Sequence, residues 1–187
     1  MRIGIGYDIH RFNGRRPLKL GGVRIPFGRG LAGHSDADVL LHALADALLG
    51  ALGGPDLGEL FPSSSPKWRH ADSRRFVEAA YARVRRDGWT VGNVDATVIA
   101  DAPTLVGYKP KMRAAIGRLL HIEVGRVSVK AKTTEGFAPA KQGIAAQAVV
   151  LLEPSRPPSA SGLGTSSPTP RNRGVPGLGR RRSRSKT

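Results

Sequence analysis

The first ten residues, MRIGIGYDIH (1–10), predict the strand on which the rest of the fold depends. Apolar side chains at positions 3, 5, 7 and 9 alternate with glycines at 4 and 6 and with Asp8 and His10. This period of two is typical of a strand with one buried face. We expect the apolar face to be the buried one, and the glycines to leave the other face open to a ligand or a neighbouring backbone. Asp8 and His10 then lie side by side on that open face, at the end of the strand.

The composition divides the chain into two parts. Residues 1–153 have a mixed composition with regular apolar periods, and their length suits one domain with its own core. Residues 154–187 are mostly Pro, Ser, Gly, Thr and Arg, with no aromatic and no acidic side chain. Such a segment buries too little apolar surface to offset the entropy of ordering, so we expect a disordered basic tail.

The net charge of +16 is shared between the two parts, because eight of the 30 Lys and Arg residues and none of the 14 acidic residues lie in 154–187. A basic domain suits an anionic substrate. The RRRSRSK run at 180–186 could contact nucleic acid or anionic lipid. A solvated surface explains both features equally well.

The chain contains no cysteine, which excludes a disulfide framework and a thiolate metal site. Any metal ligands must therefore be histidines and carboxylates. No apolar run approaches the roughly 18 residues of a membrane span, and the N-terminus lacks the apolar stretch of a signal peptide. We expect a soluble, cytoplasmic protein.

Apolar periods and chain-breaking residues predict an alternation of strands and helices that does not form one regular βαβ series. We therefore expect an α+β fold, a mixed β-sheet with helices packed on one face. Ser35 and Asp38 resemble a capping box that opens the first helix. The expected elements are strands at 2–10, 89–100, 124–132 and 143–152, a hairpin at 17–25, and helices from Ser35 to about 52, at 73–87 and at 109–121.

His42 is the best third partner for Asp8 and His10. Positions 38, 42 and 46 are spaced by four, so Asp38, His42 and Asp46 share one polar helix face. Asp46 could hold the second imidazole nitrogen of His42, as carboxylates do for metal-bound histidines. Asp8, His10 and His42 would give zinc three ligands and leave one open position, a catalytic pattern. On spacing alone, a histidine that is merely hydrogen-bonded at the surface is the more common outcome.

Two other groups suggest phosphate binding. His34 and Ser35 precede the first helix, where free N–H groups and the helix dipole attract anions. Lys130, Lys132 and the Thr133-Thr134-Glu135 run end a strand with cations, hydroxyls and a carboxylate that suits Mg²⁺. Each group also has a simpler explanation, an N-cap in the first case and a solvated strand end in the second.

Several motifs together resemble the family of 2-C-methyl-D-erythritol 2,4-cyclodiphosphate synthases, in order along residues 1–153. They are MRIGIGYDIHRF (1–12), LGGVRIPFGRGLAGHSDADVLLHALADALLGA (20–51), PDLGELFP (55–62), NVDATVIADAPTL (93–105), VSVKAKTTEG (127–136) and GIAAQAVVLL (143–152). The tail has no counterpart in the family pattern.

The resemblance implies an intramolecular phosphoryl transfer in the non-mevalonate isoprenoid pathway. The 2-phosphate of 4-diphosphocytidyl-2-C-methyl-D-erythritol 2-phosphate attacks the β-phosphorus, CMP leaves and a cyclic diphosphate forms. Such a reaction needs mainly alignment and charge stabilisation. The resemblance also implies a homotrimer with active sites between subunits. The apolar strand at 144–152 could be buried on both faces, as a trimer requires, although a central strand of a monomer looks the same.

The resemblance further implies roles for individual residues. It agrees with Zn²⁺ or another divalent cation on Asp8, His10 and His42, and it places Mg²⁺ or Mn²⁺ with the diphosphate on Glu135. His34 and Thr133 would be catalytic. The implied substrate-binding residues are Ser35, Asp56, Leu57, Gly58, Phe61, Ala100, Asp101, Ala102, Pro103, Thr104, Leu105, Val106, Lys132, Thr134, Phe137 and Lys141.

Three departures from the family pattern concern substrate contacts. Ser63, Ser64 and Ser65 stand where the family has the acid-containing DTD of its FPDTDP run, and the 136–142 loop is two residues shorter. The expected phosphate-binding arginine falls on Ala140, and the neighbouring Lys141 lacks the fork geometry of a guanidinium. The acid expected before Gly143 is Gln142.

The departures support a second hypothesis, a catalytically weakened relative that still binds metal and isoprenoid phosphates. A third is tail-driven nucleic-acid binding, although interleaved aromatics and a recognised nucleic-acid module are missing.

Overall fold

The computed structural model describes residues 1–13, 16–136 and 142–155. Most of the predicted basic tail, and the loop positions Phe137, Ala140 and Lys141, lie outside the described residues. Pro154 and Ser155, which we had assigned to the tail, continue the domain instead. Pro154 ends the last strand, and the Ser155 N–H donates to the Gly88 carbonyl over 2.8 Å.

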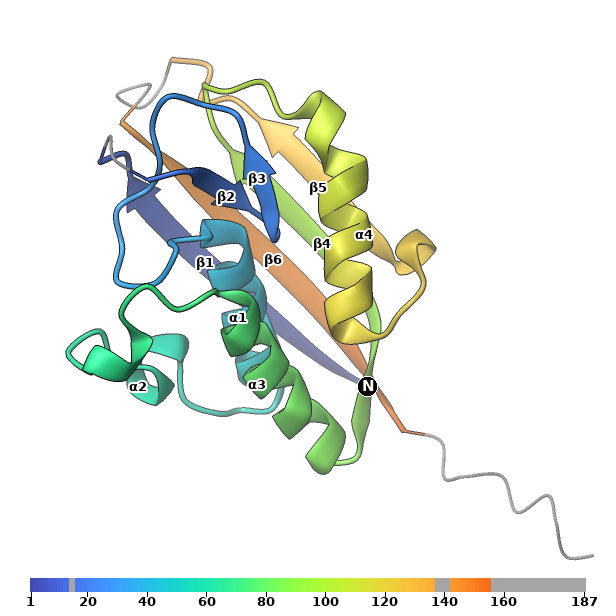
Figure 1. Ribbon diagram of the computed structural model, residues 1–187. Helices are drawn as coiled ribbons and strands as arrows, with labels where there is room; N and C mark the ends of the chain where they lie inside the picture. Colours follow the sequence, from blue (N-terminus) through green and yellow to red (C-terminus); the bar gives the residue numbers. More distant parts are fainter. Residues whose placement is uncertain (14–15, 137–141, 156–187) are drawn as a thin grey trace, which may run out of the picture. The chain divides into compact units, whose positions relative to one another are not determined.

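A four-stranded sheet forms the centre of the fold, in the order β1-β6-β4-β5. β1 (Arg2–Arg11) and β4 (Trp89–Ile99) each pair antiparallel with β6 (Gly143–Pro154), and β5 (Val127–Lys132) pairs parallel with β4. The predicted mixed sheet is confirmed. β1, β4 and β5 therefore run in the same direction, and their C-terminal ends lie at the same end of the sheet (Figure 1).

The helices α1 (Val39–Ala51), α3 (Arg74–Arg86) and α4 (Lys109–Leu120) lie on one face of this sheet, as predicted (Figure 1). The hairpin of β2 (Leu18–Leu20) and β3 (Val23–Ile25) lies on the same side. Its turn residues Gly21 and Gly22 have φ of +58° and +76°, which favours glycine at both positions.

Short elements that the sequence did not predict connect these parts. They are α2 (Leu57–Leu60) and three 3-10 turns, Pro66–Trp68, Val106–Tyr108 and Val124–Arg126. The last of these turns occupies the first residues of the predicted strand at 124–132, so β5 begins at Val127. Among the described residues, no helix is both long and apolar enough to cross a bilayer.

The burial of β1 is the reverse of the prediction. Gly4 and Gly6 face α1 so closely that a Cβ on either would lie 1.9 Å from the carbonyl oxygen of Ala47 or Ala43. The apolar face is uncovered instead: Ile3, Ile5, Tyr7 and Ile9 are 73%, 61%, 56% and 62% exposed. An alternating pattern shows that two faces differ, but the glycines decide which face a helix can approach.

β6 is likewise covered on only one face within the single chain. Ile144, Ala146, Ala148 and Val150 are buried toward the helices, while Gln147 and Val149 on the opposite face are exposed. Val149 pairs with Ile5 in the neighbouring strand. The uncovered faces of β1 and β6 thus form one largely apolar surface, in which Gln147 is polar.

The start of α1 also differs from the prediction. Asp38, not Ser35, is the N-cap: its carboxylate accepts hydrogen bonds from Leu41 N at 3.1 Å, from Gly21 N at 2.8 Å and from Gly22 N at 2.7 Å. Asp38 is fully buried, and nearly every residue of α1 is buried with it. Of the polar face that we predicted, Asp38 and His42 are therefore buried, whereas Asp46 is only partly buried and lines a cavity.

Candidate metal centre

Asp8, His10 and His42 meet where the end of β1 packs against the first turn of α1. Asp8 Oδ2 lies 2.8 Å from His10 Nε2 and 2.9 Å from His42 Nδ1, and the two ring nitrogens are 3.2 Å apart. Each residue offers one possible ligand atom, and these three atoms all lie within 4.8 Å of one another. The sequence predicted this trio, because strand alternation and helical spacing both pointed to it.

The outer nitrogen of each imidazole has its own partner. His10 Nδ1 lies 2.5 Å from the Ala32 carbonyl oxygen, which can only accept, so Nδ1 carries the proton. His42 Nε2 lies 2.9 Å from Ser73 Oγ and 3.0 Å from Ser35 Oγ. These contacts leave His10 Nε2 and His42 Nδ1 facing the Asp8 carboxylate. Without a metal, each of these nitrogens can donate a hydrogen bond to Asp8, and on losing its proton it offers a lone pair to a metal instead. A carboxylate oxygen and two neutral imidazole nitrogens are ligands that zinc accepts, so the donor set fits that ion.

Charge and burial shift the protonation of this cluster. Burial alone would raise the pKa of Asp8, but hydrogen bonds from His10 and His42 outweigh it and hold that pKa well below its usual range. Burial would lower the pKa of His10, but its hydrogen bond to Asp8 and the attraction of that carboxylate raise it. Asp8 is therefore held as a carboxylate, the form that binds a metal.

The predicted contact between Asp46 and His42 is wrong. The Asp46 carboxylate accepts a hydrogen bond from the N–H of Leu57 at 2.7 Å, and burial raises the pKa of Asp46. Asp46 thus holds the start of α2, while Ser73 and Ser35 occupy the position expected for it. Sequence reasoning missed Ser73 because it lies 31 residues from His42 and no local spacing connects the two.

A cavity of about 460 Å³ opens at the metal cluster, the name used here for the side chains of Asp8, His10 and His42 that could hold a metal ion. The capping box of α2, in which Asp56 and Glu59 accept hydrogen bonds from each other's backbone N–H groups, forms part of its wall. The cavity collects Asp8, His10 and His42 with six of the residues that the family resemblance implied, and with Asp46, Pro62, Ser63 and Ser64. Those six are His34, Ser35, Asp56, Leu57, Gly58 and Phe61.

An aromatic wall that the sequence did not predict completes the cavity. The ring of Phe61 lies 4.7 Å from that of Phe76 and 5.0 Å from that of Trp68, measured between centroids. Trp68 and Phe76 line the cavity with it. Helical spacing predicts Phe76 only as part of the buried face of α3, and such a pattern does not reveal that its ring borders a site.

The other implied residues lie at the ends of β4 and β5. Ala100 N donates to the Lys132 carbonyl at 2.8 Å, and the Asp101 carboxylate accepts from Thr134 N at 2.8 Å and from its hydroxyl at 2.9 Å. The Thr133 hydroxyl donates to Glu135. None of the residues in 100–106 or 132–135 lines the cavity beside the metal cluster. Within one chain the implied site residues therefore form two separate groups, one at the end of β1 and one at the ends of β4 and β5. Both groups lie at the same end of the sheet, and β6 separates β1 from β4.

Comparison with known proteins identifies the family. The model of the YgbB family matches residues 1–153. The chain belongs to the YgbB family. Among curated YgbB-type relatives, the 2-C-methyl-D-erythritol 2,4-cyclodiphosphate synthase of Proteus mirabilis is 51% identical over 154 residues, covering 81% of this chain and 96% of its own. The synthase of Geobacillus kaustophilus is 52% identical over 156 residues, covering 82% and 99%.

Solved structures with the same fold agree with this family assignment. The bifunctional IspDF of Campylobacter jejuni superimposes with a TM-score of 0.78 at 42% identity, covering 82% of this chain and 42% of its own. A 2C-methyl-D-erythritol-2,4-cyclodiphosphate synthase solved in a CDP-bound form has a TM-score of 0.76 at 39% identity, covering 81% and 100%.

Proposed function

We propose that this YgbB-family protein is a 2-C-methyl-D-erythritol 2,4-cyclodiphosphate synthase. It converts 4-diphosphocytidyl-2-C-methyl-D-erythritol 2-phosphate to the cyclic diphosphate and CMP. An oxygen of the 2-phosphate bonds to the β-phosphorus, the bond from that phosphorus to the oxygen bridging to CMP breaks, and CMP leaves with the electron pair. The observation that carries this proposal is the Asp8, His10 and His42 cluster, which opens on a cavity in a chain that matches named synthases along their whole length.

Asp8, His10 and His42 would hold a zinc ion through one carboxylate oxygen and two imidazole nitrogens. Bound there with an open position, zinc supplies a Lewis acid for a phosphoryl oxygen. His34 and Ser35 line the same cavity and would bind and stabilise the transferring phosphoryl group. Asp56 and Gly58 would hold substrate hydroxyls at the opposite wall. Such binding groups accelerate the reaction by aligning attacking oxygen, phosphorus and leaving oxygen.

The residues at the ends of β4 and β5 would serve a second part of the substrate. Residues 100–106 and Lys132 would frame the cytidine, and Thr133 would contact the phosphates. Glu135 would hold Mg²⁺ or Mn²⁺ with the diphosphate, because hard divalent cations prefer carboxylate and phosphate oxygens. Phe137 and Lys141, implied beside them, stay predictions outside the described residues.

A homotrimer would unite the two groups at a boundary between subunits. Support comes from the apolar surface of β1 and β6, which includes Ile5 and Val149 and is uncovered in the single chain. Exposed contiguous apolar surfaces of this kind mark contact sites between proteins. The cation-rich end of β5 on one subunit would then face the metal cluster of the next. The cytoplasmic location stays a prediction.

The test is a phosphorus NMR assay. Purified protein loaded with Zn²⁺ and supplied with Mg²⁺ and the substrate should release CMP and the cyclic diphosphate in equal amounts. The Asp8→Asn variant, which keeps the size of the side chain but loses the charge, should release far less. A zinc-loaded, assembled wild-type protein that releases no CMP would contradict the synthase proposal.

The weakened-relative hypothesis is motivated by the altered loop at 136–142, most of which lies outside the described residues. A second departure can be placed: Ser63 lines the cavity wall, so the loss of the acid expected there changes a surface that the substrate would touch. The same NMR assay separates the hypotheses: slow CMP release with normal zinc content would favour the weakened relative. Restoring this acid with Ser63→Asp should then raise the rate.

A further inference from the structure

Beyond the three metal ligands, the structure shows a chain of buried polar groups behind His42. It begins at the imidazole Nε2 and passes through the hydroxyl of Ser73 to the carboxylate of Asp36. Ser73 is fully buried and His42 is 7% exposed, so solvent is a poor substitute for these partners. None of the roles implied by the family resemblance includes Ser73 or Asp36.

Proton counting fixes the direction of each hydrogen bond. His42 Nε2 must carry the proton if Nδ1 is to bind a metal, so Nε2–H donates to Ser73 Oγ over 2.9 Å. The carboxylate of Asp36 can only accept, so the Ser73 hydroxyl donates to its Oδ1 over 2.5 Å. Ser73 N donates to the same oxygen at 3.1 Å. The hydroxyl thus accepts from His42 and donates to Asp36 at the same time.

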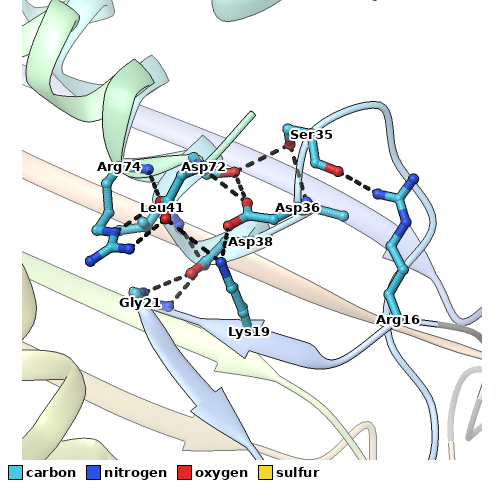
Figure 2. A network of polar contacts seen from close by, with 12 residues as sticks. Arg16, Lys19, Gly21, Ser35, Asp36, Asp38, Leu41, Asp72 and Arg74 are labelled. Carbon is cyan, nitrogen blue, oxygen red and sulfur yellow. Dashed lines mark hydrogen bonds and ion pairs between the residues drawn. The ribbon is translucent and has the colours of Figure 1, made fainter. Parts of the chain in front are cut away.

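Beyond Ser73, the Asp36 carboxylate is paired with the ammonium of Lys19. Lys19 Nζ lies 2.8 Å from Asp36 Oδ2 and 3.6 Å from Asp72, which in turn pairs with Arg74 (Figure 2). The Asp36 hydrogen bond is the main reason that the pKa of Lys19 is raised. The Asp36 carboxylate therefore bridges the Lys19 ammonium and the Ser73 hydroxyl.

Backbone pairing holds the two segments in register. His70 N donates to the His34 carbonyl at 2.7 Å, and Asp36 N donates to the Ala71 carbonyl at 2.9 Å. These two bonds clamp the residues before α1 against the residues before α3. Ser73 and Asp36 consequently reach the back of His42 from two different segments of the chain.

Ser35 offers a comparison within the same site. Its hydroxyl is also buried and lies 3.0 Å from His42 Nε2, yet its other described partners are Ala37 N at 3.1 Å and Ser73 Oγ at 3.2 Å. Ser35 is not hydrogen-bonded directly to a carboxylate. The two serines therefore differ mainly in whether a negative charge stands behind the hydroxyl.

We propose that Ser73 is a positioning residue for the metal, and that Asp36 acts through it. Together they select the Nε2–H tautomer of His42, orient its ring and increase the basicity of Nδ1. This arrangement is a hydroxyl-relayed form of the carboxylate–histidine–metal triad. The inference rests on the metal site of the proposed function and adds the residues that set its metal affinity.

Zinc titration in the absence of substrate tests the proposal. Competition of wild-type and variant proteins with a chromophoric chelator for Zn²⁺ gives the dissociation constants. Ser73→Ala should weaken zinc binding by about 10- to 100-fold, the usual loss on removing such an outer partner. Asp36→Asn should weaken it by about tenfold, while Ser35→Ala should change it by less than about threefold. Ser73→Thr, which keeps the hydroxyl, should recover most of the affinity.

Stability of the metal-free proteins separates positioning from folding. The variants should retain the wild-type circular dichroism, and the order of zinc affinities should not follow the order of metal-free melting temperatures. If Ser73→Ala does not fold, Asp36→Asn carries the comparison, because it leaves both hydroxyls in place. Zinc affinity within twofold of wild type in Ser73→Ala, or equal losses in the two serine variants, would overturn the proposal.

The two proposals fail in different ways. If wild-type protein binds zinc and releases CMP while Ser73→Ala binds zinc normally, only the positioning role is wrong. If Ser73→Ala loses zinc as expected but the loaded wild-type protein releases no CMP, only the synthase proposal is wrong.

Discussion

Asp8, His10 and His42 come from a strand end and a helix, and their facing side-chain atoms lie within 3.2 Å of one another. Asp8 lies within 2.9 Å of both ring nitrogens. Removing any one of the three side chains therefore leaves only two that could bind a metal. A two-ligand remnant holds zinc weakly, since zinc sites of this kind use three protein ligands.

We therefore expect His42→Ala to abolish stoichiometric zinc binding and to lower turnover by at least about 100-fold. Metal analysis by atomic absorption and the phosphorus NMR assay measure the two effects. The matched control is His121→Ala, which removes a histidine that stacks on Tyr81 at the end of α4. Full zinc content in His42→Ala would refute the ligand assignment.

Asp72 gives a prediction about pH. Its hydrogen bonds with Arg74 lower its pKa to about 2. A carboxyl group whose pKa is depressed on folding stabilises the fold above its unfolded pKa, and this contribution disappears as pH falls toward the folded pKa. Arg74 is exposed and Asp72 partly exposed, so solvent screens the pair and its contribution is at most about 1 kcal/mol.

Asp72→Asn should therefore lower the free energy of unfolding by at most about 1 kcal/mol at pH 7. The difference from wild type should shrink as pH falls from about 4 toward 2. Urea denaturation at a series of pH values measures it. A difference that grows on acidification has the opposite sign and would contradict the assignment.

At the scale of elements, the contact between β1 and α1 depends on glycine. The backbone of α1 approaches Gly4 and Gly6 within a distance that no side chain permits. This approach brings Asp8 and His10, later on the same face of β1, against the first turn of the helix that carries His42. The glycines thus determine the separation of the metal ligands.

Gly6→Ala should destabilise the fold by about 3 kcal/mol or more, because its Cβ would meet the Ala43 carbonyl and force β1 and α1 apart. Gly28→Ala, where a Cβ would meet nothing within 4 Å, should change stability by less than about 0.5 kcal/mol. Chemical denaturation of both variants gives the comparison. Equal stabilities would show that the close approach is not required.

Several elements could be predicted because their patterns are local. The limits of β1, α3, β4 and α4 follow from alternation, helical spacing and breakers such as Gly88. The start of α1 could not be predicted, because Asp38 becomes the cap only when the Gly21-Gly22 turn supplies two further N–H donors. The contact of His42 with Ser73 likewise depends on segments that meet only in the folded chain.

For the whole molecule, the uncovered face of β1 and β6 is the main unexplained surface of the single chain. The face includes four apolar side chains that are more than half exposed, those of Ile3, Ile5, Tyr7 and Ile9. Leaving each of them in water rather than burying it has an unfavourable hydrophobic free energy. Contact with further copies of the chain would bury them and would place a second group of site residues beside the metal cluster.

Ile5→Asp should therefore prevent trimer formation while leaving the single chain folded, because this side chain contacts water rather than the core of one chain. Light scattering coupled to size-exclusion chromatography measures the mass, and CMP release should fall with it. Val124→Asp, at another exposed apolar position, is the control. A trimer that survives Ile5→Asp would contradict this interface.

The sequence alone predicted the strand and helix order, the mixed sheet and the meeting of Asp8, His10 and His42 as candidate metal ligands, because alternation, helical spacing and breakers act over a few residues. Only the tertiary structure decided which face of β1 is covered, which groups orient His42, and how Phe61, Trp68 and Phe76 wall the cavity. These features depend on close approach between distant segments, and the spacing of residues along the chain does not record such distances. Asp46 and Ser73 show the difference: a favourable spacing suggested the first, and packing supplied the second.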